Sequence, residues 1–214
     1  VDRARDGRSF TTRRVTAVQH GETIFTMSAS FQRPEEGVEH QAPMPDTPGP
    51  EGLRRRDMPP VPADRPAFTT TGRALTWPLD VRYVDHTPWD STADRDPTNR
   101  VWVRADGELP DPDSAGGRLL HVCVLTYASD LTLLEAAVFP HVVGGAASGE
   151  VSLASLDHAV WFHRPFRADE WLLYVQESPS AGGGRGLAAG RFYTRDGVLV
   201  ASVVQEGLIR RHPP

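Results

Sequence analysis

Three polar side chains stand inside strongly apolar stretches, and their types could together activate a water molecule. Asp130 lies in an apolar segment with helical periodicity, whereas Ser155 and Gln205 lie in apolar runs typical of strands. A carboxylate beside an apolar stripe can act as a general base, and a hydroxyl and an amide can hold a water or a carbonyl in place. Asp130, Ser155 and Gln205 are therefore the candidate catalytic residues. The alternative is that each is a hydrogen-bonded polar residue of the core, and spacing alone leaves both interpretations open.

Other residues that could carry chemistry lack the required spacing. His158 and His163 are five apart, so on one strand they would face opposite sides and could not ligate one ion. We expect structural roles for both. The glycine runs lack the spacing of phosphate or dinucleotide loops, and Cys123 is expected to pack on an apolar helix. The sequence therefore predicts no metal and no cofactor.

The elements that must position the candidate trio are one helix and several strands. The helix is predicted over Leu119–Phe139, where apolar residues recur every three or four positions and Pro140 follows. The run Val151–Phe166 is apolar on both faces, which favours a strand covered on both sides by a helix and by another sheet or subunit. Three shorter runs are also predicted to be strands: Leu79–Val84, Asn99–Ala105 and Trp171–Ser178.

Hairpins are predicted near both ends of the chain. The first joins Ser9–Gln19 to Thr23–Gln32, and the second joins Gly186–Thr194 to Val198–Ile209. The two hairpins resemble each other in sequence, which indicates an internal repeat. Because a helix and several strands precede only the second hairpin, we expect the first repeat to be incomplete.

A proline-rich segment separates the two hairpins. Ten of the 19 prolines lie between Arg33 and Pro78, and proline blocks helix interiors and central strands. We therefore predict three parts: residues 1–32 as the hairpin of the first repeat, 33–78 as a linker, and 79–214 as a complete second repeat. The fold class is α+β, a helix wrapped by an antiparallel sheet and duplicated.

Several long stretches resemble one known family. They are Arg5–Phe10 with Ser28–Gln32, Tyr127–Leu131, Ser155–Phe166, Glu170–Tyr174 and Asp196–Gly207. Together they closely resemble the bacterial acyl-CoA thioesterase II family. The similarity runs over nearly all 214 residues and is weakest in the proline-rich segment.

This resemblance implies a double hotdog fold and the hydrolysis of acyl-CoA thioesters to free acid and CoA. It also implies a catalytic trio, formed by an Asp on the hotdog helix, a Thr or Ser at the start of the next strand and a Gln in the last strand. These positions fall on Asp130, Ser155 and Gln205, the residues already selected on chemical grounds. In the first repeat Phe31 or a neighbour stands at the position of Gln205, so no second trio is expected.

Two other functions stay open. A hotdog enoyl-CoA hydratase resembles this fold but carries a His about five residues after the catalytic Asp, where this chain has Glu135. A non-catalytic acyl-CoA or acyl-chain binding module would leave Asp130 with a structural role only.

Charge and composition limit the partners. The net charge is −5 with scattered arginines, which argues against nucleic acid, since duplex binding needs a concentrated basic face. No apolar run reaches the roughly 18 residues of a membrane-spanning helix, so we expect no membrane partner. The last residues, Arg210–Pro214, lack a Ser-Lys-Leu-type peroxisomal address, so we expect a cytoplasmic location. One cysteine excludes a disulfide framework. The expected substrate is an acyl-CoA, and the two-sided apolar run Val151–Phe166 predicts a homo-oligomer.

Overall fold

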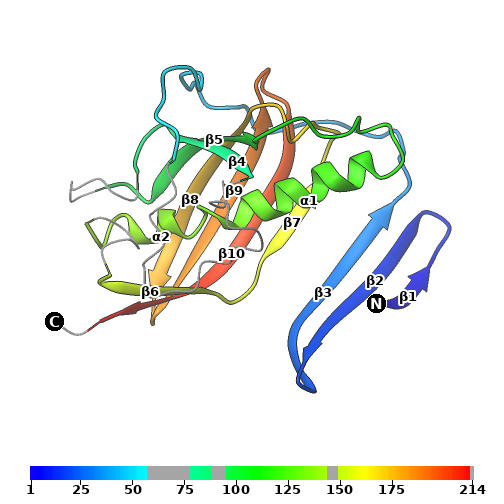
Figure 1. Ribbon diagram of the computed structural model, residues 1–214, viewed down its shortest axis with the longest axis horizontal. Coiled ribbons are helices and arrows are strands. Elements are labelled where there is room, and N and C mark those ends of the chain that lie inside the picture. The colour runs from blue at the N-terminus through cyan, green and yellow to red at the C-terminus, as the bar shows by residue number, and fades with distance from the viewer. Residues whose placement is uncertain (57–77, 88–94, 144–148, 213–214) are drawn as a thin grey trace, which may run out of the picture. The chain divides into compact units, whose positions relative to one another are not determined.

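The fold is described from a computed structural model that covers residues 1–56, 78–87, 95–143 and 149–212 (Figure 1). The chain divides into two compact units, Val1–His40 and Gln41–Pro214. Each unit is built around antiparallel strands, and within the described residues both helices belong to the second unit. The α+β class predicted from the sequence is confirmed.

The first unit is a three-stranded antiparallel sheet in the order β1-β2-β3. Its strands are β1 (Asp2–Asp6), β2 (Phe10–Gln19) and β3 (Glu22–Gln32). The predicted hairpin is β2–β3, turned at His20 and Gly21, which both have positive φ. Strand β1 was not predicted, because its charged residues carry no apolar alternation.

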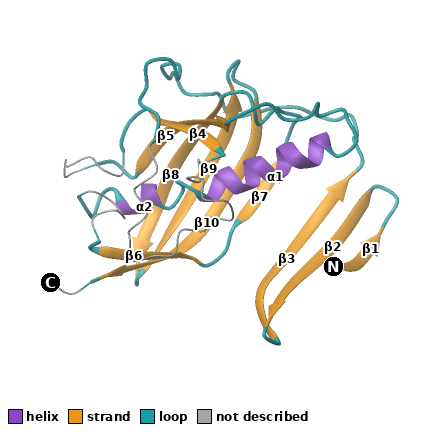
Figure 2. Cartoon of the chain, in the orientation of Figure 1, coloured by secondary structure: helices purple, strands orange, loops and turns teal. Residues whose placement is uncertain are grey.

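The second unit is a seven-stranded antiparallel sheet crossed on one face by α1 (Figures 1 and 2). The strand order is β4-β5-β8-β9-β10-β6, and β7 also pairs with β10. The helices are α1 (Gly117–Asp130) and the short α2 (Glu135–Val138). The strands are β4 (Leu79–Tyr83), β5 (Thr98–Ala105), β6 (Val151–Ser155), β7 (Ala159–Phe162), β8 (Leu172–Gly182), β9 (Arg185–Thr194) and β10 (Leu199–Arg211).

Alternation along the strands gives this sheet two apolar faces. Val101 and Val103 of β5 belong to the main core, together with Leu125 and Ala128 of α1. Trp102, between the two valines, belongs to a second cluster, as the period of two along a strand requires. The helix therefore buries one stripe against one face of the sheet, and its opposite side is left exposed.

The second apolar face is covered by residues 41–56, the middle of the proline-rich segment. Met44 and Leu53 pack against Trp102 and its neighbours. The indole Nε1 of Trp102 donates to the main-chain oxygen of Pro48 at 2.8 Å. Residues 41–56 are thus part of the second unit, whereas residues 57–77 of the predicted linker lie outside the described residues.

The prediction of one helix over Leu119–Phe139 is wrong, because the helix is interrupted after Asp130. The hydroxyl of Tyr174, on β8, donates to the main-chain oxygen of Ser129 at 2.9 Å. An unbroken helix would use that oxygen for the N–H of residue 133, so a side chain from the sheet takes the place of the helical bond. Gly190 makes room for this ring, since a Cβ there would collide with Tyr174.

The run Val151–Phe166 forms two strands instead of one. Both β6 and β7 pair with β10, and residues 156–158 bulge between them. Leu156, Trp161 and Phe162 are exposed in the single chain, so within the described residues no second sheet covers them, and cover by another subunit stays a prediction. The homo-oligomer that this run suggested also stays a prediction.

The segment Gly117–Val138 is long and apolar. By length and composition alone, its 22 residues could cross a membrane. Half of the apolar window is buried in the second unit, where the segment supplies the core helix. The core helix of a soluble protein meets the same criterion, so this segment is weak evidence for a membrane span.

Candidate active site

The structure brings the three candidate residues together at the end of α1. The amide Nε2 of Gln205 donates to Asp130 Oδ1 at 2.7 Å and to Ser155 Oγ at 2.6 Å. The Ser155 hydroxyl donates to the same Asp130 Oδ1 at 3.1 Å. The three side chains therefore form a closed hydrogen-bonded triangle.

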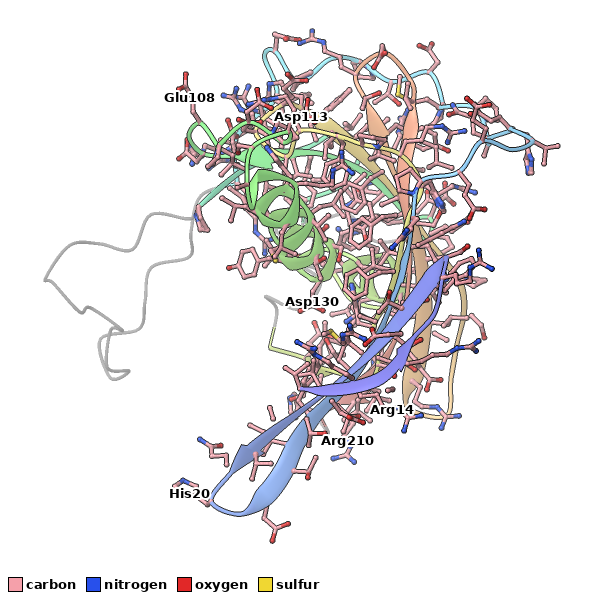
Figure 3. All side chains as sticks on the ribbon, turned by 90° about the vertical axis from the view of Figure 1, so that its right-hand side faces the viewer. Arg14, His20, Glu108, Asp113, Asp130 and Arg210 are labelled. Atoms are coloured by element: carbon pink, nitrogen blue, oxygen red, sulfur yellow. The ribbon has the colours of Figure 1, made fainter. Side chains whose placement is uncertain are left out.

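Each residue stands at a defined point of the fold. Asp130 is the last residue of α1, as Figure 3 shows, Ser155 is the last residue of β6, and Gln205 lies in the middle of β10. Gly207, two residues after Gln205, faces Ser155 in the β6–β10 ladder. The interruption of the helix places Asp130 beside strand β10, and the end of β6 places Ser155 beside the same strand.

Exposure differs sharply within the triangle. Gln205 is fully buried, whereas Asp130 and Ser155 are exposed although both lie in apolar stretches of the sequence. Asp130 is exposed because it lies at the end of α1. Within the described part of the chain, both hydrogen bonds to this carboxylate end on Oδ1. The other oxygen, Oδ2, can therefore accept a proton from a water that reaches it from solvent.

Sequence reasoning missed two members of this network, His158 and Ser129. Ring atom Nδ1 of His158 lies 3.0 Å from Gln205 Oε1, and Nε2 lies 2.7 Å from the hydroxyl of the fully buried Ser129. The treatment of residues 151–166 as one strand hid this contact. The available signal was the polar pair Asp157-His158, which interrupts the apolar run where the bulge occurs.

A second carboxylate, Glu135, lies five residues after Asp130 and is buried. The hydroxyl of Tyr83 donates to its Oε2 at 2.8 Å, and Arg56 Nη2 lies 3.5 Å from its Oε1. Burial raises the pKa of Glu135 to about 7, an effect that Arg56, the Tyr83 hydroxyl and Arg95 partly offset. This carboxylate is enclosed by its own partners and is not part of the triangle.

The other sequence candidates lie outside the triangle. His163 contacts the hydroxyl of Ser202, 2.8 Å from its Nε2. Cys123 is exposed and is not part of the core, which corrects the expectation that it packs there. Together with Tyr127 and Leu79 it lines a cavity of about 340 Å³. In the described ranges, no three His, Cys, Asp or Glu side chains gather in a way that could hold a metal ion.

Comparison with known proteins gives a consistent result. The sequence profile of a family described as acyl-CoA thioesterase matches residues 75–208, and that of the acyl-CoA thioesterase N-terminal domain matches residues 1–32. Human acyl-coenzyme A thioesterase 8 is 40% identical over 222 residues, an alignment that covers 100% of this chain and 67% of the human protein. The chain belongs to the acyl-CoA thioesterase family.

Solved structures agree with this assignment. The acyl-CoA thioesterase II TesB2 of Mycobacterium marinum is 46% identical with a TM-score of 0.76, over 99% of this chain and 72% of that one. A hot dog fold protein from Alicyclobacillus acidocaldarius matches 99% of this chain and 72% of its own with a TM-score of 0.67. At 21% identity this second match speaks for the fold alone. The predicted hotdog architecture and thioesterase activity are confirmed, and the thioesterase carries its hydrogen-bonded triangle on α1, β6 and β10.

Proposed function

We propose that this acyl-CoA thioesterase hydrolyses its substrate with a water activated by Asp130, Ser155 and Gln205. One observation carries the proposal: a single buried amide, that of Gln205, contacts both Asp130 Oδ1 and Ser155 Oγ. The Asp130 side chain is exposed, and both of its hydrogen bonds within the described residues use Oδ1, so Oδ2 is available to a water, as a general base requires.

The proposed reaction has two steps. Asp130 takes a proton from water as the water oxygen bonds to the thioester carbonyl carbon, which gives a tetrahedral intermediate. The carbon–sulfur bond then breaks, the acid is released, and the proton held by Asp130 passes to the CoA thiolate. Gln205 and Ser155 hold the carboxylate in one orientation through both steps. Because water attacks the thioester directly, no covalent enzyme intermediate is required.

The surroundings of Glu135 disfavour the hydratase alternative. Hydration would need a second acid–base group at this position, yet Glu135 is buried and hydrogen-bonded to Tyr83. The binding-module alternative predicts acyl-CoA binding without turnover. It differs from the proposal in one measurable respect, the release of free thiol.

The test is thiol release from acyl-CoAs of increasing chain length by wild type and by Asp130→Asn. Asparagine keeps the size of the side chain and removes the base, so kcat/KM is expected to fall about 10²- to 10⁴-fold. The matched control is Asp113→Asn, the same chemical change at an exposed carboxylate near the opposite end of α1 (Figure 3). This control should keep wild-type kcat/KM.

Thermal unfolding of all three proteins shows whether they are equally folded. Wild-type turnover by a folded Asp130→Asn protein would refute the role of the trio. Acyl-CoA binding by a folded wild type that releases no thiol would favour the binding module. A parallel loss in Asp113→Asn would mean that the effect is not specific to Asp130.

A further inference from the structure

His158 joins the candidate trio to the interior of α1. Its ring is partly buried and bridges two fully buried side chains, Gln205 through Nδ1 at 3.0 Å and Ser129 through Nε2 at 2.7 Å. Ser129 directly precedes Asp130, and its main-chain oxygen accepts the hydrogen bond from Tyr174. The imidazole therefore contacts both the strand that carries the amide and the helix that carries the carboxylate.

The carboxylate determines which end of the Gln205 amide faces it. At 2.7 Å from Asp130 Oδ1, an amide oxygen would place two acceptors in contact, whereas Nε2 donates. The second hydrogen of Nε2 points to Ser155 Oγ. The amide oxygen must then face His158, so it requires a donor from the ring.

The imidazole can supply that donor in both of its protonation states. In the neutral ring, Nδ1–H donates to Gln205 Oε1, and Nε2 accepts from the Ser129 hydroxyl. In the doubly protonated ring, Nε2–H donates to Ser129, whose hydroxyl turns to the main-chain oxygen of Thr126 at 2.8 Å. The Nδ1–H bond to the amide is the same in both states.

The bulge between β6 and β7 holds His158 in this place. Asp157 Oδ1 accepts from the main-chain N–H of Glu206 at 2.8 Å, and the N–H of Leu156 donates to the oxygen of Glu206 at 2.9 Å. Both bonds tie the bulge to the residue next to Gln205. In a regular strand without the bulge, His158 would lie at a different position along β10, away from the Gln205 amide. The bulge therefore makes this contact possible.

We propose that His158 is a positioning residue, which fixes the Gln205 amide with its NH₂ group toward Asp130 and Ser155. This rests on the proposed function of the trio. Without the ring donor, the amide can turn its oxygen toward Asp130 and push the carboxylate out of position. The expected loss is in kcat, because binding of the acyl-CoA does not depend on this bond.

The test uses three variants in the same assay. His158→Leu removes the donor at similar volume, and kcat is expected to fall about 10- to 100-fold with KM unchanged, the size of effect that a misplaced group causes. His158→Asn places an amide nitrogen at the same number of bonds from Cα as Nδ1, so it should recover most of the lost kcat. His163→Leu is the matched control, because the ring of His163 is hydrogen-bonded to the Ser202 hydroxyl and not to the trio, and it should keep the wild-type kcat.

A measurement on the wild-type protein is independent of how the variants fold. Nitrogen-15 NMR of the His158 ring should find Nδ1 protonated throughout the active pH range, and a ring protonated only on Nε2 would overturn the proposal. Wild-type kcat in His158→Leu, or equal losses in His158→Leu and His158→Asn, would overturn it too.

Asp130→Asn, measured alongside, separates this proposal from the proposed function. Full activity in Asp130→Asn would mean that the trio itself is wrong. An inactive Asp130→Asn protein with a fully active His158→Leu protein would reject only the positioning role.

Discussion

Two carboxylates stand five residues apart on either side of the helix interruption, and their surroundings are opposite. Asp130 ends α1, is exposed, and receives hydrogen bonds from the neutral donors Gln205 and Ser155. Glu135 begins α2, is buried, and lies against Tyr83 with Arg56 nearby. Both are held by hydrogen bonds, but Asp130 is exposed, whereas only 10% of the Glu135 side chain is. Access to solvent, more than the number of partners, is therefore what distinguishes the two carboxylates.

Burial has a measurable consequence at Glu135. It raises the pKa of the carboxyl to about 7, whereas Arg56, Tyr83 and Arg95 act in the opposite direction. The same burial, together with the charge of Glu135, raises the pKa of Tyr83. This cluster joins α2 to β4 inside the core, so its contribution should be to stability. The triangle at Asp130 should contribute to turnover.

The largest expected effect is on the stability of Glu135→Ala. The change deletes a buried side chain and the acceptor of the Tyr83 hydroxyl, so the free energy of unfolding should fall by about 4 kcal/mol at pH 5. Asp130→Ala should change it by no more than about 1 kcal/mol, because this side chain is exposed. Urea denaturation measures both values. Equal costs would show that the two carboxylates do not differ as described.

The second-largest expected effect is a pH dependence of the free energy of unfolding that is caused by Glu135. Its native pKa, about 7, lies above the ordinary 4.5, so between these pH values the folded protein holds a proton that the unfolded chain has lost. The unfolding free energy should therefore fall as pH rises from 4.5 to 8, by about 3 kcal/mol from this group. Residue 135 cannot titrate in Glu135→Gln, so the unfolding free energy of this variant should fall less over the same pH range. Parallel curves for the two proteins would contradict the assignment.

Comparison of these sites with the sequence shows what pattern alone can reveal. Periodicity placed Gln205 in a strand and Asp130 in a helix, and the chemistry of their side chains was sufficient to select them. The end of the helix could not be predicted, because it depends on Tyr174 from a strand 44 residues downstream of Asp130. The exposure of Asp130 follows from that end, so it was missed as well.

The contact of His158 was hidden for a related reason. An apolar run with one polar pair fits either a continuous strand or two strands with a bulge, and local pattern does not separate them. The bulge is fixed by bonds from Leu156 and Asp157 to Glu206, about fifty residues away in sequence. The trio could be proposed from residue types, whereas its supporting contacts depend on pairing between distant strands.

The smallest expected effect tests whether a hydroxyl that donates to a carboxylate has the same role at Asp130 and at Glu135. Ser155→Ala removes one donor from Asp130 and should lower kcat/KM about tenfold, since a hydrogen bond of about 1.4 kcal/mol corresponds to a factor of ten. Tyr83→Phe removes the donor to Glu135 and should lower stability with kcat/KM unchanged. Ser155→Thr keeps the hydroxyl and should keep most of the activity. Thiol release and urea denaturation on all three variants decide the matter. If Tyr83→Phe lost activity as Ser155→Ala does, the buried cluster would have to act on the triangle through the interrupted helix, and the separation of the two carboxylates by solvent access would be incomplete.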